Sequence, residues 1–329
     1  MGAEKEIIAV SIFKKWGEAY PMALGIQKPI LGIQKYKHSK KRIAEARAAY
    51  IFILPAMTII GMFTIYPSIR LFFMSIYNTT FVNGKSLSEF IGLQNYRWIF
   101  DDSLFYKSLW NSFYFPLVVT PIQTAIALGM AILLNSRIKG IGFFRTVYFI
   151  PVVMSFVMIA IVWKNMLNTD FGVINKILRA LGYESMRFLT SPSLSKPSIA
   201  FVSIWKSWAW YMVIFTSALH EIPEELYEAA TIDGANAWQK FSRITMPMLR
   251  NSLLFVIIIS TMNNIKVFTP VMIMTDGGPL DSSRSIVHYI WSTAFRMSNF
   301  GAATAMSVIL FLIMLTVSLI QNRLLQSKD

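Results

Sequence analysis

Long apolar stretches separated by short polar segments set the pattern of this chain. A helix that crosses a membrane needs about 20 predominantly apolar residues, and six stretches approach or exceed that length. They cover residues 51–74, 110–134, 145–167, 199–219, 251–275 and 300–320. The alternation of apolar and polar residues that is typical of spanning strands is absent. The pattern therefore predicts an all-α fold, a polytopic membrane bundle of six transmembrane helices.

Prolines interrupt several of these stretches. A proline inside a helix removes one backbone hydrogen bond, and the bilayer core offers no water to replace it. We therefore expect several of the six helices to be kinked or broken where a neighbour or a cavity satisfies the freed carbonyls. The prolines inside the predicted spans are Pro55, Pro67, Pro116, Pro121, Pro151 and Pro270.

Composition agrees with a membrane protein. The chain has 329 residues, of which 55% are hydrophobic and 15% charged, and its mean hydropathy is +0.50. An ordinary globular domain has about 25% charged residues. Because the chain contains no cysteine, a disulfide framework, a thiolate metal site and a cysteine nucleophile are all excluded.

The net charge of +14 follows the positive-inside pattern rather than a nucleic-acid-binding one. Basic residues cluster before the first predicted span, in the second and fourth connections, and after the last span. The connection between the third and fourth spans is also basic, which fits this pattern less well. We still expect both termini and segment 221–249 to be cytoplasmic, because four segments agree and the predicted number of spans is even.

These patterns predict three parts. Residues 1–49 form a cytoplasmic extension that is partly interfacial, because apolar and basic residues between Ile7 and Trp16 suit a short surface helix. Residues 50–325 form the six-helix domain, and residues 326–329 a cytoplasmic tail.

Segment 221–249 is the most informative polar connection. Acidic residues from Glu221 to Glu228 crowd the start of a predicted helix, where the helix dipole favours carboxylates. Gly234 permits a sharp change of direction, and apolar residues then recur at helical spacing up to Pro247. The segment predicts two short helices at an angle, and an ordinary cytoplasmic surface helix is the simpler alternative.

The same segment resembles the EAA loop of permeases of ABC importers. The match consists of Glu228-Ala229-Ala230, then Gly234, then Ile244-Thr245-Met246-Pro247. Met246 replaces the usual Leu, and Pro270 stands where an acidic residue is common. Further matches to carbohydrate-type permeases are Leu54-Pro55-Ala56 with Tyr66-Pro67, Ile91 to Tyr96, Asn111-Ser112, Gly142 to Thr146 with Ile150-Pro151, Thr231 to Ala235, and Thr275 to Pro279.

The resemblance implies a permease subunit that forms half of the translocation path for a sugar or oligosaccharide. Its implied partners are a second permease, a paralogue of this chain, two ABC ATPase subunits, an external solute-binding protein and the lipid bilayer, with no nucleic acid. The implied location is a bacterial or archaeal plasma membrane. This chain would bind no cofactor, because ATP and Mg²⁺ belong to the ATPases, and it contains no G-x-x-x-x-G-K-[S/T] phosphate loop. The residues implied in ATPase docking are Glu224, Glu228, Ala229, Ala230, Asp233, Gly234, Ala235, Ile244 and Pro247.

Two polar or aromatic faces are candidates for the substrate path. Ser260, Asn263 and Asn264 lie at three-to-four spacing in the fifth span near Lys266, and either substrate contact or interhelical hydrogen bonding would explain them. Trp205, Trp208 and Tyr211 belong to an aromatic stripe in the fourth span that suits either sugar stacking or packing.

Other functions fit the sequence less well. An importer of a polyol or glycerol phosphate is the nearest alternative, and a channel would not need an acidic docking loop. His38, His220 and His288 are scattered, without the helical pair of a metalloprotease. We therefore expect no catalysis and no metal site.

Overall fold

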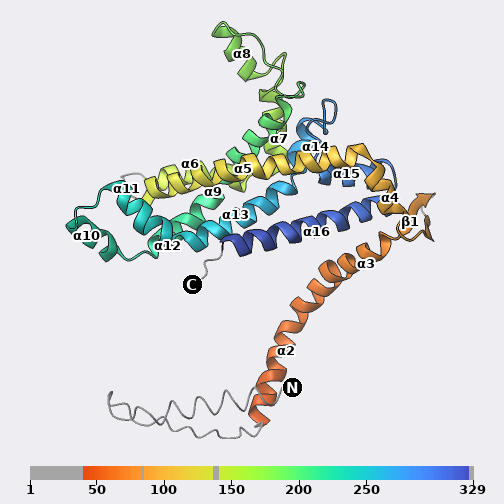
Figure 1. The fold of residues 1–329 in the computed structure, drawn as a ribbon, viewed down its shortest axis with the longest axis horizontal. Helices are drawn as coiled ribbons and strands as arrows, with labels where there is room; N and C mark the ends of the chain where they lie inside the picture. The colour runs from red at the N-terminus through yellow and green to blue at the C-terminus, as the bar shows by residue number, and fades with distance from the viewer. Residues whose placement is uncertain (1–39, 83–84, 136–140, 326–329) are drawn as a thin grey trace. The chain divides into compact units, whose positions relative to one another are not determined.

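The computed structural model describes residues 40–82, 85–135 and 141–325 (Figure 1). The chain divides between Phe63 and Thr64 into two compact units. The surface helix expected near residues 7–16 and the tail 326–329 lie outside the described residues. The boundary expected at residues 49 and 50 stays a prediction.

The first span combines three elements: α2 (Lys40–Ile60), the π-helix η1 (Gly61–Ile65) and α3 (Tyr66–Met74). The π-helix lies directly before Pro67, where a widened turn adapts the helix to the missing backbone donor. No residue of α3 is buried. Such a surface is stable only against lipid or another protein.

A small polar structure follows the first span. Strands β1 (Tyr77–Val82) and β2 (Lys85–Phe90) pair antiparallel with Tyr77 opposite Phe90, and α4 (Gln94–Asp101) comes next. Asn95 is buried and donates hydrogen bonds to the carbonyl oxygens of Ser75 and Tyr77, at 2.9 and 3.0 Å. This hairpin was not predicted from the sequence.

The second predicted span is part of one long helix, and the third is broken. Helix α5 (Ser103–Asn135) starts before residue 110 and continues through both of its prolines without interruption. Helices α6 (Ile141–Val153) and α7 (Phe156–Met166) meet at an angle of 95°, and the break begins two residues after Pro151. The short helix α8 (Val173–Ala180) follows, and α9 (Ser195–His220) forms the fourth span.

The fifth span is also interrupted. After the loop helices α10 (Glu224–Ile232) and α11 (Ala237–Lys240), the π-helix η2 (Phe241–Thr245) and α12 (Met246–Met248) lead into α13 (Arg250–Ile265). Helix α14 (Thr269–Met274) begins after a break, with Pro270 in its first turn. The prediction that prolines break some of the spans is therefore confirmed for the third and fifth.

The last part of the chain contains α15 (Ile286–Trp291), the π-helix η3 (Ser292–Arg296) and the sixth span, α16 (Phe300–Leu325). Five helical stretches of the described chain are long and apolar enough to cross a membrane, and the bent pair α6–α7 brings the number to six. The predicted helical membrane bundle is confirmed, with six spans if α6 and α7 cross the membrane as one.

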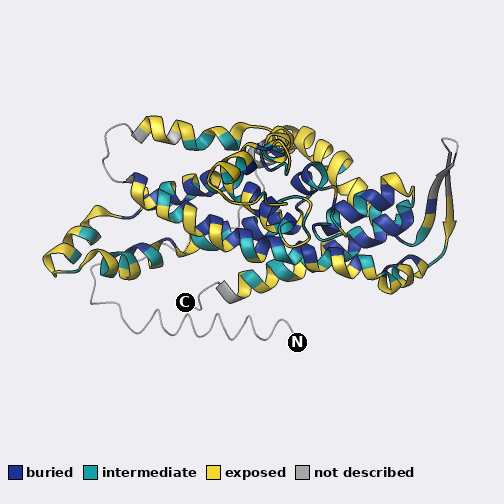
Figure 2. Cartoon of the chain, turned by 90° about the horizontal axis from the view of Figure 1, so that it is seen from above, coloured by how far each residue is buried: buried dark blue, intermediate teal, exposed yellow. Residues whose placement is uncertain are grey.

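The core lies where α5, α9, α13 and α16 run alongside one another (Figure 1). Its buried side chains include Phe115, Ile199 and Val271 in one cluster, and Phe105, Ile265 and Met306 in another. Figure 2 shows buried residues along the inner faces of these helices and exposed residues on their outer faces. The loop α10–α11 lies at one end of this layer, and β1 with α4 at the other.

Candidate docking loop and translocation face

Helix α10 begins with acidic residues, as the sequence predicts. Pro223 occupies the N-cap position with extended backbone, and Glu224 and Glu225 fill the first turn. No side chain caps the first amides of this helix. The two carboxylates therefore interact with the partial positive charge of the helix start.

Gly234 ends α10 in the left-handed conformation, with a φ of +76°. A Cβ atom at this position would meet no other atom within 4 Å, so the constraint is the backbone angle alone. The amides of Gly234 and Ala235 donate to the carbonyl oxygens of Thr231 and Ala230, at 3.0 and 2.8 Å. These bonds satisfy the end of the helix and fix the turn.

The second arm starts with a capping box. The Asn236 side chain accepts from the amide of Gln239 at 2.9 Å, and the Gln239 side chain accepts from the amide of Asn236 at 2.8 Å. This reciprocal pair satisfies two donors that a helix start otherwise leaves free. The two short helices predicted on either side of Gly234 are present.

Two cross-links hold the arms together. The hydroxyl groups of Tyr227 and Thr245 lie 2.9 Å apart, and the Lys240 ammonium donates to the Thr231 hydroxyl at 2.7 Å. The first joins α10 to the π-helix that precedes the fifth span, and the second joins the two arms near the turn. Segment 221–249, which we call the elbow, is thus a braced structure.

The predicted docking residues lie mostly on the outside of the elbow. Glu224, Glu228, Ala229, Asp233 and Gly234 are exposed, as is Pro247. Ala230 and Ala235 are half-buried, and Ile244 packs against the helical core. Within the described part of the chain, none of the ion pairs involves a carboxylate of the elbow.

The two most exposed large apolar side chains of the elbow are Ile232 and Trp238. Ile232 is 87% exposed and Trp238 is 71% exposed. Sequence reasoning did not select them, although apolar residues in a polar connection are a signal that could have done so. Together with the unpaired carboxylates, they give the elbow the mixed character of a protein-binding surface.

The aromatic residues of α9 separate into two surroundings. Trp205 and Trp208 line an open pocket of 410 Å³ between α5 and α9, together with Tyr114 and Phe201. Tyr211 is instead buried in the core, and its hydroxyl interacts with the side chains of Asn263 and Ser260. Of the three aromatic residues predicted for the substrate path, only Trp205 and Trp208 line this pocket.

The polar residues of α13 are similarly divided. Ser260 and Asn264 are buried in a network with α5, in which the Ser260 hydroxyl and the Asn264 amide both donate to Thr120, at 2.9 and 3.3 Å. Gln123 also donates to the Ser260 hydroxyl. Asn263 and Lys266 are exposed, and Lys266 lies at the break between α13 and α14.

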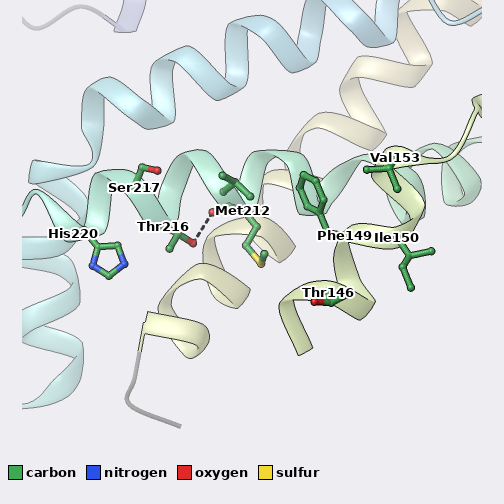
Figure 3. A pocket seen from close by; sticks show the side chains of 9 residues that line it. Thr146, Phe149, Ile150, Val153, Met212, Thr216, Ser217 and His220 are labelled. Carbon is green, nitrogen blue, oxygen red and sulfur yellow. Dashed lines mark hydrogen bonds between the residues drawn. The ribbon is translucent and has the colours of Figure 1, made fainter. Parts of the chain in front are cut away.

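A second open groove lies between α6 and the far half of α9 (Figure 3). Its volume is 690 Å³, and Phe149, Ile150, Val153 and Met212 line it. Its polar residues include Thr216, whose hydroxyl donates to the Met212 carbonyl, and His220 at one end. The groove is mostly apolar, as expected of a surface that contacts lipid or another helix.

The described histidines form no metal site. No cluster of three His, Asp or Glu residues with metal-binding geometry occurs in the described ranges, and His38 lies outside them. His288 is fully buried, and its Nε2 atom lies 2.9 Å from a carboxylate oxygen of Asp276. Arg296 contacts both oxygens of the same carboxylate at 2.9 and 3.0 Å, so Asp276 links two segments rather than offering a ligand.

A six-span helical bundle with broken spans, polar faces within the bilayer and a braced elbow is the architecture of a membrane transport permease. The chain matches the family described as binding-protein-dependent transport system inner membrane component over residues 123–328, and it belongs to that family.

Relatives and solved structures agree with this assignment. The chain is 30% identical to the trehalose/maltose transport system permease of Thermococcus litoralis, over 86% of this chain and 95% of that protein. It is 33% identical to the lactose transport system permease of Rhizobium radiobacter, over 83% of this chain and 92% of that protein. Its fold is similar to a chain of a bacterial ABC transporter that imports the acidic polysaccharide alginate, with a TM-score of 0.76, 22% identity, and coverage of 87% and 97%.

Proposed function

We propose that this chain is one of two permease subunits of an ATP-driven importer for a sugar or oligosaccharide. Membership of a binding-protein-dependent transport family supports the importer. Relatives named for the transport of trehalose, maltose and lactose support the class of substrate. In this proposal, an external solute-binding protein delivers the sugar, and a paralogous permease supplies the other half of the path.

The observation that carries the proposal is the braced elbow with exposed carboxylates that form no ion pair among the described residues. A rigid projection that a partner grips can transmit movement, whereas a flexible loop would absorb it. We infer that each of two ATPase subunits holds one elbow, with Glu228 paired to a basic residue of the ATPase and the small side chains of Ala229 and Ala230 permitting close approach. ATP and Mg²⁺ belong to those subunits, and this chain catalyses no reaction.

The proposed orientation places the elbow and both termini in the cytoplasm of a bacterial or archaeal cell. The basic residues of the elbow and of the second connection support it, because basic residues favour the inner side of the membrane. In this orientation β1, β2 and α4 face the solute-binding protein.

Charge reversal at Glu228 tests the role of the elbow. Glu228→Lys removes the proposed ion pair and sets two cations against each other, which costs about 2 kcal/mol or more at an interface and weakens binding about 30-fold or more. We expect sugar uptake in cells and the amount of co-purified ATPase to fall accordingly, while the variant remains in the membrane.

Glu225→Lys is the matched control, because it makes the same charge change in the first turn of the same helix, outside the predicted docking set. It should retain most uptake. Normal uptake by Glu228→Lys, or equal losses in both variants, would contradict the proposed contact. A co-purified complex that transports only polyols or glycerol phosphate would keep the importer but change its substrate.

A further inference from the structure

Lys206 is a cation near the middle of a membrane span. It is the twelfth residue of the 26-residue helix α9, so about 17 Å of helix separates it from the nearer end. Its side chain is half-buried. Its ammonium group donates a long hydrogen bond of 3.3 Å to the carbonyl oxygen of Val152 and lies 5.6 Å from the centre of the Phe156 ring.

The six candidate spans contain no aspartate or glutamate. The described ion pairs all lie in the connection between the fifth and sixth spans, far from Lys206 in sequence. No carboxylate from a span of this chain can therefore neutralise Lys206. A lysine at the centre of a bilayer costs about 2.5–3.5 kcal/mol on insertion scales, and such residues commonly mark a path for substrates or ions.

A second lysine on the same helix has surroundings that differ from those of Lys206. Lys196 lies one residue from the start of α9, donates to the side-chain oxygen of Asn111 at 3.0 Å, and lies 5.2 Å from the centre of the Tyr114 ring. It therefore has a polar side-chain partner and lies close to the aqueous phase. Lys206 has neither.

The surroundings of Lys206 suit a ligand that is both a sugar and an anion. Val152 and Phe156 lie on the two sides of the break in the third span, and the first amides of α7 have no side-chain cap. Trp205, next to Lys206 in sequence, packs edge-to-face against Trp163 of α7, with ring centres 5.5 Å apart. Aromatic faces stack on sugar rings, and an ammonium group pairs with acidic substituents.

We propose that Lys206 is a specificity-determining residue that binds an acidic group on the transported sugar, such as the carboxylate of a uronic acid. This inference rests on the proposed function and narrows its substrate class to acidic saccharides. The alternative partner of Lys206 is a carboxylate of the second permease.

The test uses the complete complex, with its ATPases and binding protein, in proteoliposomes. Uptake is measured for two matched pairs of sugars: trimannuronate with mannotriose, and triglucuronate with cellotriose. The variants are Lys206→Met, Lys206→Arg and the control Lys196→Met. We expect the natural protein to take up at least one acidic trisaccharide, and Lys206→Met to raise the KM for it about tenfold or more with a smaller change in kcat.

Lys206→Arg keeps the charge and should retain most of the affinity, and Lys196→Met should change the KM less than threefold. Equal loss of acidic and neutral uptake in Lys206→Met would overturn the proposal, because a counter-ion in the second permease or a purely structural role predicts that result. Uptake of neutral sugars alone by the natural protein would overturn this proposal and leave the proposed function intact. Uptake of none of the four sugars would overturn this proposal, and uptake of maltose or lactose by the same complex would then keep the proposed function.

Discussion

Asn263 and Asn264 are neighbours in sequence with opposite surroundings. Asn264 is 8% exposed and bonded to Thr120 and to the Ser260 carbonyl, whereas Asn263 is exposed. Successive residues of a helix point about 100° apart, so only one of the two can face α5. The sequence spacing placed both on one polar face, and the position of α5 decides which of them is buried.

This contrast predicts different effects for one substitution at two positions. Asn264→Leu should destabilise the protein by about 0.6–1.7 kcal/mol, from the average to the largest value measured for hydrogen bonds between membrane helices. Asn263→Leu should cost less stability, because the Asn263 side chain is exposed apart from its interaction with the Tyr211 hydroxyl, and it should alter the KM for transport. Unfolding in a denaturing detergent and uptake kinetics measure the two effects. Equal stability of both variants would show that the buried network contributes little.

At the scale of elements, His288 joins α15 to the loop before it. Burial lowers the pKa of His288, the nearby charges of Arg284 and Arg296 lower it further, and the hydrogen bond to Asp276 opposes the shift. Burial tends to raise the pKa of Asp276, but its hydrogen bonds and charge interactions with Arg296 and His288 hold that pKa below its ordinary value. At neutral pH the site therefore contains a neutral histidine and an ionised carboxylate.

Mild acid should destabilise this part of the protein. Below the ordinary histidine pKa of about 6.5, the unfolded chain binds a proton that buried His288 resists, so stability falls as the pH falls. At pH 5.5 the loss is at most about 1.4 kcal/mol. Asp276 remains ionised in this range and adds no pH dependence. Melting curves of the natural protein and of His288→Gln at pH 8.0 and 5.5 test this, since the variant should show the smaller decrease.

Elements with local signals could be predicted, and elements set by distant contacts could not. The elbow was predictable because Pro223, the acidic first turn and Gly234 each determine the backbone only of the residues next to them. The hairpin β1–β2 was not, because Asn95 and residues of α16 hold it in place. The sequence did not predict which prolines would interrupt a helix. The chain breaks soon after Pro151, whereas Pro116 and Pro121 lie within the unbroken helix α5.

At the scale of the whole molecule, the number of spans followed from apolar length alone, because each segment must satisfy its own backbone within the bilayer. The packing of the spans did not follow from it. Gly301 at the start of α16 is an example: a Cβ atom there would overlap the Tyr77 carbonyl oxygen and lie 3.0 Å from the Asn95 side chain. Segments more than 200 residues apart meet at this point.

Gly301→Ala should therefore destabilise the contact between the hairpin and the sixth span. Overpacking of this kind costs about 1–3 kcal/mol, and the expected result is a lower melting temperature and faster proteolysis of segment 77–95. Gly129→Ala is the control, because a Cβ atom there meets nothing within 4 Å. Equal stability of the two variants would show that the backbone near Tyr77 moves aside at little cost.

The right-angle bend in the third span converts a rotation of α6 into a sideways movement of α7. Helix α7 extends about 16 Å from the bend, given its 11 residues and a rise of 1.5 Å per residue. If α6 turned by about 10° around its own axis, the tip of α7 would sweep roughly 3 Å sideways, whereas the tip of a straight rod would only spin in place. A modest rotation begun at one membrane surface can thus become a lateral displacement deep within the bilayer, beside the aromatic rings of Trp163 and Trp205.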